Sequence, residues 1–155
     1  MTDTIDVLKT AITAGMTTGN SDSDDFYVKS IYTGDPLALP SIECPACSVT
    51  AVPPISRLSQ YVGEDTVTET FSVRFYQLAV RKNYEDAEIA SAFTRLRAMI
   101  KQAELVFRTD PTFGGSYVAS EIKSVNPQLP GQAGGDAYRV AEILLEVKSR
   151  ALWGL

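Results

Sequence analysis

Residues 43–48 read ECPACS and contain the two cysteines of the chain, Cys44 and Cys47, separated by two residues. This spacing occurs in zinc sites and in thiol–disulfide enzymes. A structural zinc site needs four ligands, and the chain has no further cysteine and no histidine. A thioredoxin-type pair needs a helix that starts at its first cysteine, whereas residues 48–52 are rich in β-branched residues and precede Pro53. We therefore predict two reduced cysteines, at least one of them packed as a small apolar residue.

The lack of histidine also narrows the catalytic possibilities. It excludes Ser-His-Asp and Cys-His pairs and a near-neutral imidazole base. Asp22, Asp24 and Asp25 partly match a calcium-binding loop, but the central glycine and the terminal glutamate of such a loop are missing. We interpret this segment as a solvated loop. The glycine pairs 114–115 and 134–135 match no phosphate-binding motif. We expect no enzymatic activity, no bound metal and no cofactor.

Length and composition predict one soluble domain that covers residues 1–155. No apolar run is long enough to span a bilayer, and the acidic N-terminus MTDTIDVLK does not resemble a signal peptide. We therefore expect synthesis in a reducing cytosol and no membrane contact. The net charge of −5 is divided unevenly along the chain. Residues 1–70 carry ten acids against three bases, a balance of −7, and residues 71–155 carry nine acids against eleven bases, a balance of +2.

This uneven charge fits either a solvated acidic surface or subunits that assemble head to tail. Tight nucleic-acid binding is not expected, because no basic stripe could displace the counterions of phosphates.

Hydrophobic periodicity predicts two helices and five strands. The predicted helices are Thr2–Ala14, capped by Asp3 and ended by Gly15, and Asn83–Phe107, capped by Asn83. The second helix carries one apolar stripe, formed by Ile89, Phe93, Leu96, Ile100, Ala103 and Phe107. The predicted strands are residues 26–34, 41–52, 66 to about 81, 116–126 and 137–150.

Two of these strands have informative patterns. In the third, the apolar positions change face after Phe75, which predicts a bulge near Phe75–Tyr76 or a strand whose two ends pack on different neighbours. In the last, Ala141, Ile143, Leu145 and Val147 are expected to point inward. Strands that follow each other without crossover helices favour antiparallel pairing. The predicted class is α+β: a mainly antiparallel sheet of about five strands with two helices packed on one face, in the order α-β-β-β-α-β-β.

Several segments in this order resemble the tail-terminator (tail-completion) proteins of tailed bacteriophages. The first is the N-terminal helix followed by a strand that ends in an LPSIEC segment. The others are the long strand that enters a capped helix through TFSVRFYQLAVRKNYEDAEIA, the DPTFGG turn within RTDPTFGGSYVASEIKSVNPQ, and the closing strand AYRVAEILLEVKSR. The resemblance spans nearly the whole chain and rests on the order and lengths of the elements and on the DPTFGG hinge. The cysteines of ECPACS are not part of the family pattern.

The resemblance implies a structural virion protein. Such proteins form a hexameric ring on the last ring of the tail tube, stop its polymerisation and contact the connector or stopper proteins of the neck. In contractile tails they also contact the last sheath ring. DNA passes through the central channel of the ring, and the acidic half of this chain could line that channel and repel phosphate. The resemblance implies localisation in the virion after synthesis in the host cytoplasm.

From the residues themselves we expect the contacts on three long polar loops, at residues 15–25, 53–65 and 127–136, and on the C-terminal ALWGL. The candidate interface residues are Asp22, Asp24, Asp25, Arg57, Gln60, Tyr61, Gln128, Gln132 and Trp153.

Three alternative functions stay open at this point. The first is another connector or neck ring subunit, which would form rings of twelve rather than six. The second is a thiol redox module that uses Cys44 and Cys47, which requires a thiol pKa well below the ordinary value. The third is a monomeric adaptor that binds a peptide along a sheet edge.

Overall fold

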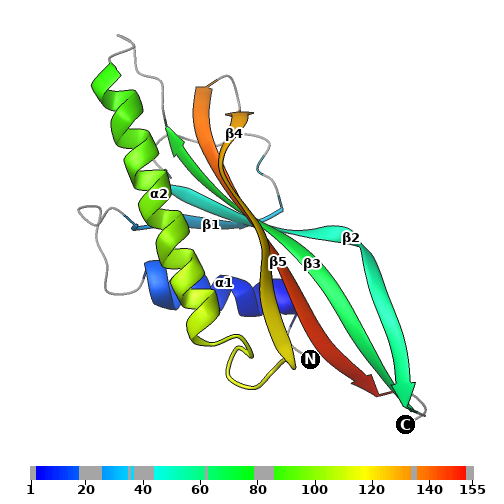
Figure 1. Ribbon diagram of the computed structural model, residues 1–155. Coiled ribbons are helices and arrows are strands. Elements are labelled where there is room, and N and C mark those ends of the chain that lie inside the picture. Colours follow the sequence, from blue (N-terminus) through cyan, green and yellow to red (C-terminus); the bar gives the residue numbers. More distant parts are fainter. Residues whose placement is uncertain are drawn as a thin grey trace.

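The computed structural model describes residues 3–17, 26–34, 36, 44–61, 63–78, 86–133 and 136–152. These residues form two helices and five strands in the predicted order (Figure 1). The elements are α1 (Thr4–Met16), β1 (Ser30–Thr33), β2 (Ala46–Tyr61), β3 (Glu64–Leu78), α2 (Asp86–Thr109), β4 (Ala119–Ala133) and β5 (Asp136–Leu152).

The strands form one sheet in the order β1-β2-β3-β5-β4. The pairs β2–β3, β3–β5 and β4–β5 are antiparallel, as expected, and the α+β class is confirmed. The expectation of antiparallel pairing is wrong for the first two strands, because β1 pairs with β2 in parallel. The connection from β1 to β2 spans residues 34–45, a length that allows the chain to return to the start of a parallel neighbour.

The main core lies between the sheet and the two helices. Phe71, Val73 and Phe75 of β3 are buried in it together with Leu96 and Phe107 of α2. The stripe predicted on α2 is confirmed at Leu96, Ile100, Ala103 and Phe107, which are all buried. The inward residues predicted on β5 are also confirmed, since Ala141, Ile143, Leu145 and Val147 are buried. The period-2 and period-3.6 patterns therefore identify one shared apolar layer.

Two explanations were predicted for the change of face at Phe75–Tyr76. The bulge is wrong, and packing on different neighbours is confirmed. The pairing of β3 with both of its neighbours continues through these residues without a register shift. Both residues are buried because the two faces of β3 have different neighbours: Phe75 belongs to the main core, and Tyr76 packs with Ala46 and Val140 on the opposite face.

Two segments expected to be loops are strands instead. β2 continues beyond Pro53 and Pro54 to Tyr61, and β4 continues to Ala133. Proline cannot donate to a ladder, so it is tolerated at sheet edges and at bulges. Pro53 and Pro54 lie in a register shift between Val52 and Ser56, and β4 is an edge strand with shifts of its own. Conversely, the strand predicted at residues 26–34 is limited to Ser30–Thr33.

The helix ends agree only in part with the prediction. Asp3 caps α1 as expected, because its Oδ1 accepts a hydrogen bond of 3.1 Å from the backbone N–H of Ile5. Gly15 does not end α1, which continues to Met16. A Cβ at position 15 would overlap the side chain of Val106 on α2, so this glycine permits a close approach between the helices. The cap predicted at Asn83 lies outside the described residues.

Candidate assembly interface

The sequence-predicted interface residues do not form one site. Asp22, Asp24, Asp25 and Trp153 lie outside the described residues. Arg57, Gln60 and Tyr61 belong to β2, whereas Gln128 and Gln132 belong to β4. Since β3 and β5 separate β2 from β4 in the sheet, the structure does not bring these two groups together. Of the five, only Arg57 has a described side chain, and it is exposed.

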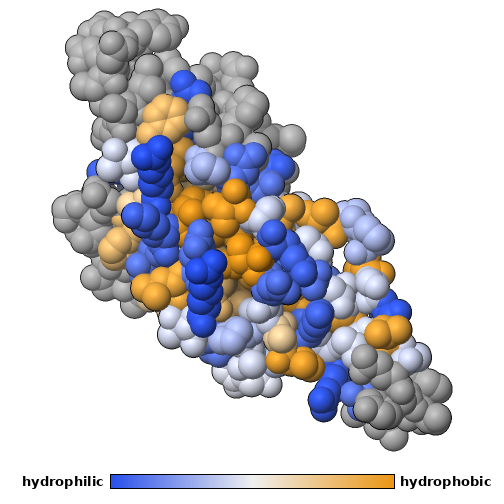
Figure 2. Space-filling model, viewed as in Figure 1, coloured by the Kyte–Doolittle hydropathy of each residue, from blue (hydrophilic) through white to orange (hydrophobic). Residues whose placement is uncertain are grey.

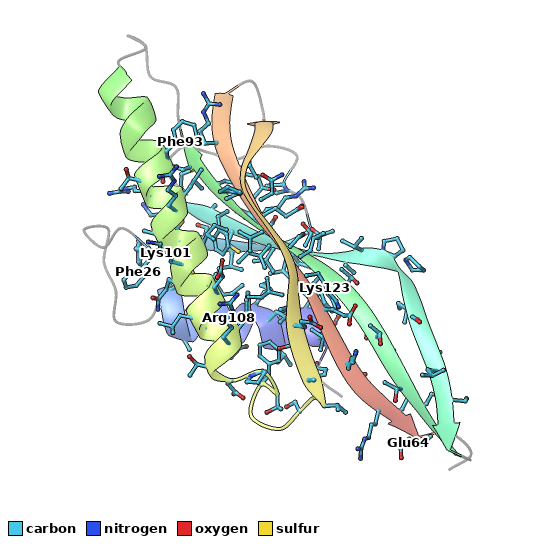
Figure 3. All side chains as sticks on the ribbon, viewed as in Figure 1. Phe26, Glu64, Phe93, Lys101, Arg108 and Lys123 are labelled. Atoms are coloured by element: carbon cyan, nitrogen blue, oxygen red, sulfur yellow. The ribbon has the colours of Figure 1, made fainter. Side chains whose placement is uncertain are left out.

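The first exposed surface is an arm formed by residues 50–61 of β2, 64–70 of β3 and 146–152 of β5. Figure 1 shows these three strands projecting beyond both helices toward the lower right, and Figure 3 places Glu64 at the far end. Arg150 binds Glu64 across the strands there, with 3.3 Å between Nε and Oε1. Strands that extend past their helices lack an apolar layer to pack against on that face. Within the arm Val67 and Val147 are buried, whereas residues 53–59 of β2 are all exposed, so the arm offers its outer β2 edge to other molecules.

The edge of the arm is the outer side of β2. β1 pairs only with residues 46–49 of β2, so the outer backbone groups of residues 50–61 have no strand beside them among the described residues. Residues 53–59 are all exposed, including Ile55 (57% exposed) and Leu58 (58%). Figure 2 shows hydrophobic side chains on the arm among hydrophilic ones.

The other edge of the sheet is protected differently. Exposed charges on β4, Glu121 and Lys123, form an ion pair of 3.1 Å on this edge. Two register shifts further interrupt the strand. Charges, prolines and bulges on an edge strand prevent pairing with other chains. β2 also has prolines and shifts, but Arg57 is its only charged residue. The β2 edge is therefore less protected than the β4 edge against contact with another chain.

The second exposed surface is an apolar groove between α1 and α2. Its volume is about 750 Å³, and its lining comprises Val7, Thr10, Ala11, Ala14, Gly15, Gln102, Leu105, Val106, Thr109, Asp110, Phe113 and Gly114. At one end the helices touch, because Gly15 lies against Val106 and its carbonyl accepts a hydrogen bond of 3.1 Å from Gln102. At the other end the turn after α2 closes the groove with Phe113, whose ring contacts Phe107 and Tyr117 edge to face.

Two groove residues face solvent with opposite character. Leu105 is 59% exposed, although it lies within a packed helix. Asp110 is exposed and is the only charged residue among the lining residues that the structure describes. One carboxylate oxygen of Asp110 accepts a hydrogen bond of 2.7 Å from the backbone N–H of Gly114. The groove therefore combines an apolar lining with one carboxylate, Asp110, which the backbone of Gly114 holds in place.

Sequence reasoning missed this groove because it placed Gly15 at a helix end and interpreted the α2 stripe only as core. A usable signal was present: Leu105 lies off the apolar stripe of α2, and its neighbours on the helix surface are polar.

The sheet face opposite the helices carries a polar network. Glu142 of β5 accepts hydrogen bonds from Ser72 (2.7 Å) and from Arg74 Nε (2.9 Å), and its side chain is only 17% exposed. Burial by itself would raise the pKa of Glu142, but the two hydrogen bonds and the positive charge of Arg74 outweigh burial and lower it.

This lowered pKa makes stability depend on pH. A carboxyl group whose pKa is lower in the folded than in the unfolded state stabilises the fold above its ordinary value near 4.5, and loses this contribution as pH falls through the folded value. At neutral pH we expect Glu142→Gln to lower the free energy of unfolding by about 1–2 kcal/mol, because a neutral amide binds Arg74 more weakly. This loss of stability should become smaller as the pH falls below 4.5 and through the lowered pKa of Glu142.

Urea unfolding of both proteins at several pH values measures this effect. Glu121→Gln is the matched control, because Glu121 is an exposed carboxylate paired with Lys123 on the surface. If the difference in the free energy of unfolding between the wild type and Glu142→Gln does not change as the pH is lowered, the lowered pKa of Glu142 is contradicted.

Neither Cys44 nor Cys47 forms a disulfide, and Cys47 is fully buried in the main core. The prediction that at least one cysteine packs as a small apolar residue is confirmed at Cys47. Burial raises the pKa of the Cys47 thiol far above its ordinary value. A redox thiol requires the opposite shift.

Among the described residues, no group of three or more cysteine, aspartate or glutamate side chains could hold a metal ion. In the same part of the chain, neither helix combines the length and the apolar character that a membrane span requires. No protein-family model matches the chain, and no curated protein matches it in sequence.

Proposed function

We propose that this chain is a structural subunit of the neck of a tailed bacteriophage. In this proposal it is a tail terminator that forms a hexameric ring, caps the tail tube, stops its polymerisation and joins the tail to the connector or stopper. Its place is then the virion, after synthesis in the host cytoplasm. The resemblance of the element order and of the DPTFGG turn to that family is the starting point.

The observation that carries the proposal is that the chain exposes two unlike surfaces, the arm and the groove, on different parts of one fold. A twofold dimer uses the same surface on both partners, whereas a ring uses two different surfaces head to tail. The exposed β2 edge of the arm carries Ile55 and Leu58 beside a basic residue, Arg57. The groove combines an apolar lining with an acidic residue, Asp110. A chain with this pair of surfaces is suited to cyclic assembly.

The charge distribution supports the same reading. The first 70 residues carry a balance of −7. An acidic channel repels the phosphates of DNA and lets the genome pass without binding. The contractile or non-contractile nature of the tail decides whether a sheath protein is a further partner.

Polymerisation of the cognate tail-tube protein tests this function. Tubes assembled with the chain should be shorter than tubes assembled alone, and electron micrographs should show a ring at one end. A twelve-subunit ring that binds the connector but leaves tube length unchanged would favour the other neck-ring function. Tubes of unchanged length without end rings would contradict the proposal.

A peptide-binding adaptor is the second candidate, and the open β2 edge is the observation that favours it. Extended peptides can add a strand to such an edge. This function predicts a monomer that stays monomeric beside tail-tube protein, so the same experiment separates the two.

A further inference from the structure

We propose that the arm of one copy docks in the α1–α2 groove of the next copy, through the β2 edge around Ile55, Arg57 and Leu58. This contact rests on the proposed ring function and specifies which surfaces meet. It is heterologous, so each copy uses its arm toward one neighbour and its groove toward the other.

The groove needs an apolar occupant with a positive charge. Leu105 of α2 is 59% exposed, and Val106 of α2 together with Val7 and Ala11 of α1 continue the apolar lining. Exposed apolar surface of this kind, bordered by polar groups, is typical of protein contacts. The one charged group of the lining, Asp110, is an acid that would select a basic partner.

The β2 edge has the complementary features. Ile55 and Leu58 are the exposed large apolar side chains of the arm, and Arg57 is the only charged residue in the whole of β2. Successive residues of a strand point to opposite faces. Leu58 and Arg57 are adjacent in β2 and therefore leave the strand in opposite directions. Leu58 can then cover Leu105 while the guanidinium of Arg57 reaches Asp110.

The occupant is a second copy because the arm cannot reach the groove of its own chain. The arm is continuous with the sheet through β3 and β5, which are paired from Glu64–Leu152 to Leu78–Tyr138. In Figure 1 it points away from the helices that form the groove. The β4 edge is the competing surface, but its Glu121–Lys123 pair and its register shifts oppose strand addition.

Two single variants test the contact: Leu58→Glu in the arm and Leu105→Glu in the groove. Both side chains are more than half exposed, so neither change removes core packing. Each variant should weaken assembly, measured by light scattering alone and with tail-tube protein, by roughly thirtyfold or more, the scale of an interface hot spot. Val125→Glu on β4 is the matched control, since Val125 is an exposed apolar residue outside both surfaces, and it should assemble normally.

Mixing the two variants gives the decisive result. Leu58→Glu retains a native groove and Leu105→Glu retains a native arm, so one intact contact can form between them and none can form beyond it. The mixture should give a 1:1 complex, whereas each variant alone should give monomer. Circular dichroism and urea unfolding of each variant verify that the fold is intact.

Other outcomes overturn the inference in distinguishable ways. If rings form normally with Leu58→Glu or Leu105→Glu, the arm–groove contact is wrong and the ring function stands. If Leu105→Glu keeps its rings and loses only tube binding, the groove belongs to the tube protein. If the wild type stays monomeric with and without tube protein, the ring function itself fails.

Discussion

Replacing Phe71 by alanine is expected to lower the free energy of unfolding by about 3–5 kcal/mol, the cost of removing a large buried aromatic side chain. Phe71 lies at the centre of β3 and is only 1% exposed. Its neighbours across the sheet are Ala51 of β2 and Leu145 of β5. Because the strands and the helices hold these neighbours in place, they cannot collapse into the space that the ring leaves.

Urea or thermal unfolding, followed by circular dichroism, measures this loss. The matched control is Ile55→Ala on the arm, an apolar truncation at an exposed position, which should change stability by no more than about 0.5 kcal/mol in the monomer. Equal losses for the two variants would contradict the placement of the core between the sheet and the helices.

Cys47 is expected to react with a thiol reagent at least about a thousandfold more slowly in the folded protein than in urea. Its side chain is fully buried, and burial raises the pKa of the thiol, so both access and thiolate formation are suppressed. Reaction then requires the buried state to open, and domains of ordinary stability open to a fraction of about one in a thousand or less.

Alkylation with iodoacetamide and mass spectrometry of the cysteine peptides measures the rate. The Cys44→Ser variant isolates the signal of Cys47, and the same variant in urea supplies the unprotected rate. Fast alkylation of Cys47 in the folded protein would contradict its place in the core. It would instead support the alternative of a thiol redox function for Cys44 and Cys47.

The sequence carried enough information for the architecture because the apolar periods are regular where the core is regular. Ala141 to Val147 alternate along β5, and Leu96 to Phe107 follow the helical repeat of α2. These two patterns specify one sheet face and one helix face that must meet. The caps and turns agree with them, as Asp3 does at the start of α1.

Strand lengths were harder to predict, because proline and charged residues occur both in edge strands and in loops. Pro53, Pro54 and Arg57 suggested a loop, yet they lie on an edge where a missing N–H and an exposed charge are tolerated. The parallel β1–β2 pair was missed for another reason: parallel and antiparallel partners bury the same side chains in such a short strand. Only the three-dimensional path of the chain distinguishes them.

The candidate interface was predictable only in outline. Arg57 was singled out from the sequence and is exposed in the arm. The groove was not predicted, because it depends on the crossing of two helices that are distant in sequence and touch through Gly15 and Val106. No sequence pattern within a single segment determines a contact between two distant helices. The exposed Leu105 is the feature of the sequence that indicates the groove.

The proposed ring of six copies gives a specific expectation for the mass of the protein in solution. Multi-angle light scattering of the purified chain, alone and with its tail-tube protein, should detect a species with the mass of six 16.8 kDa chains, in free solution or at the tube end. A mass of one chain under both conditions, at concentrations where the tube protein polymerises, would contradict the account.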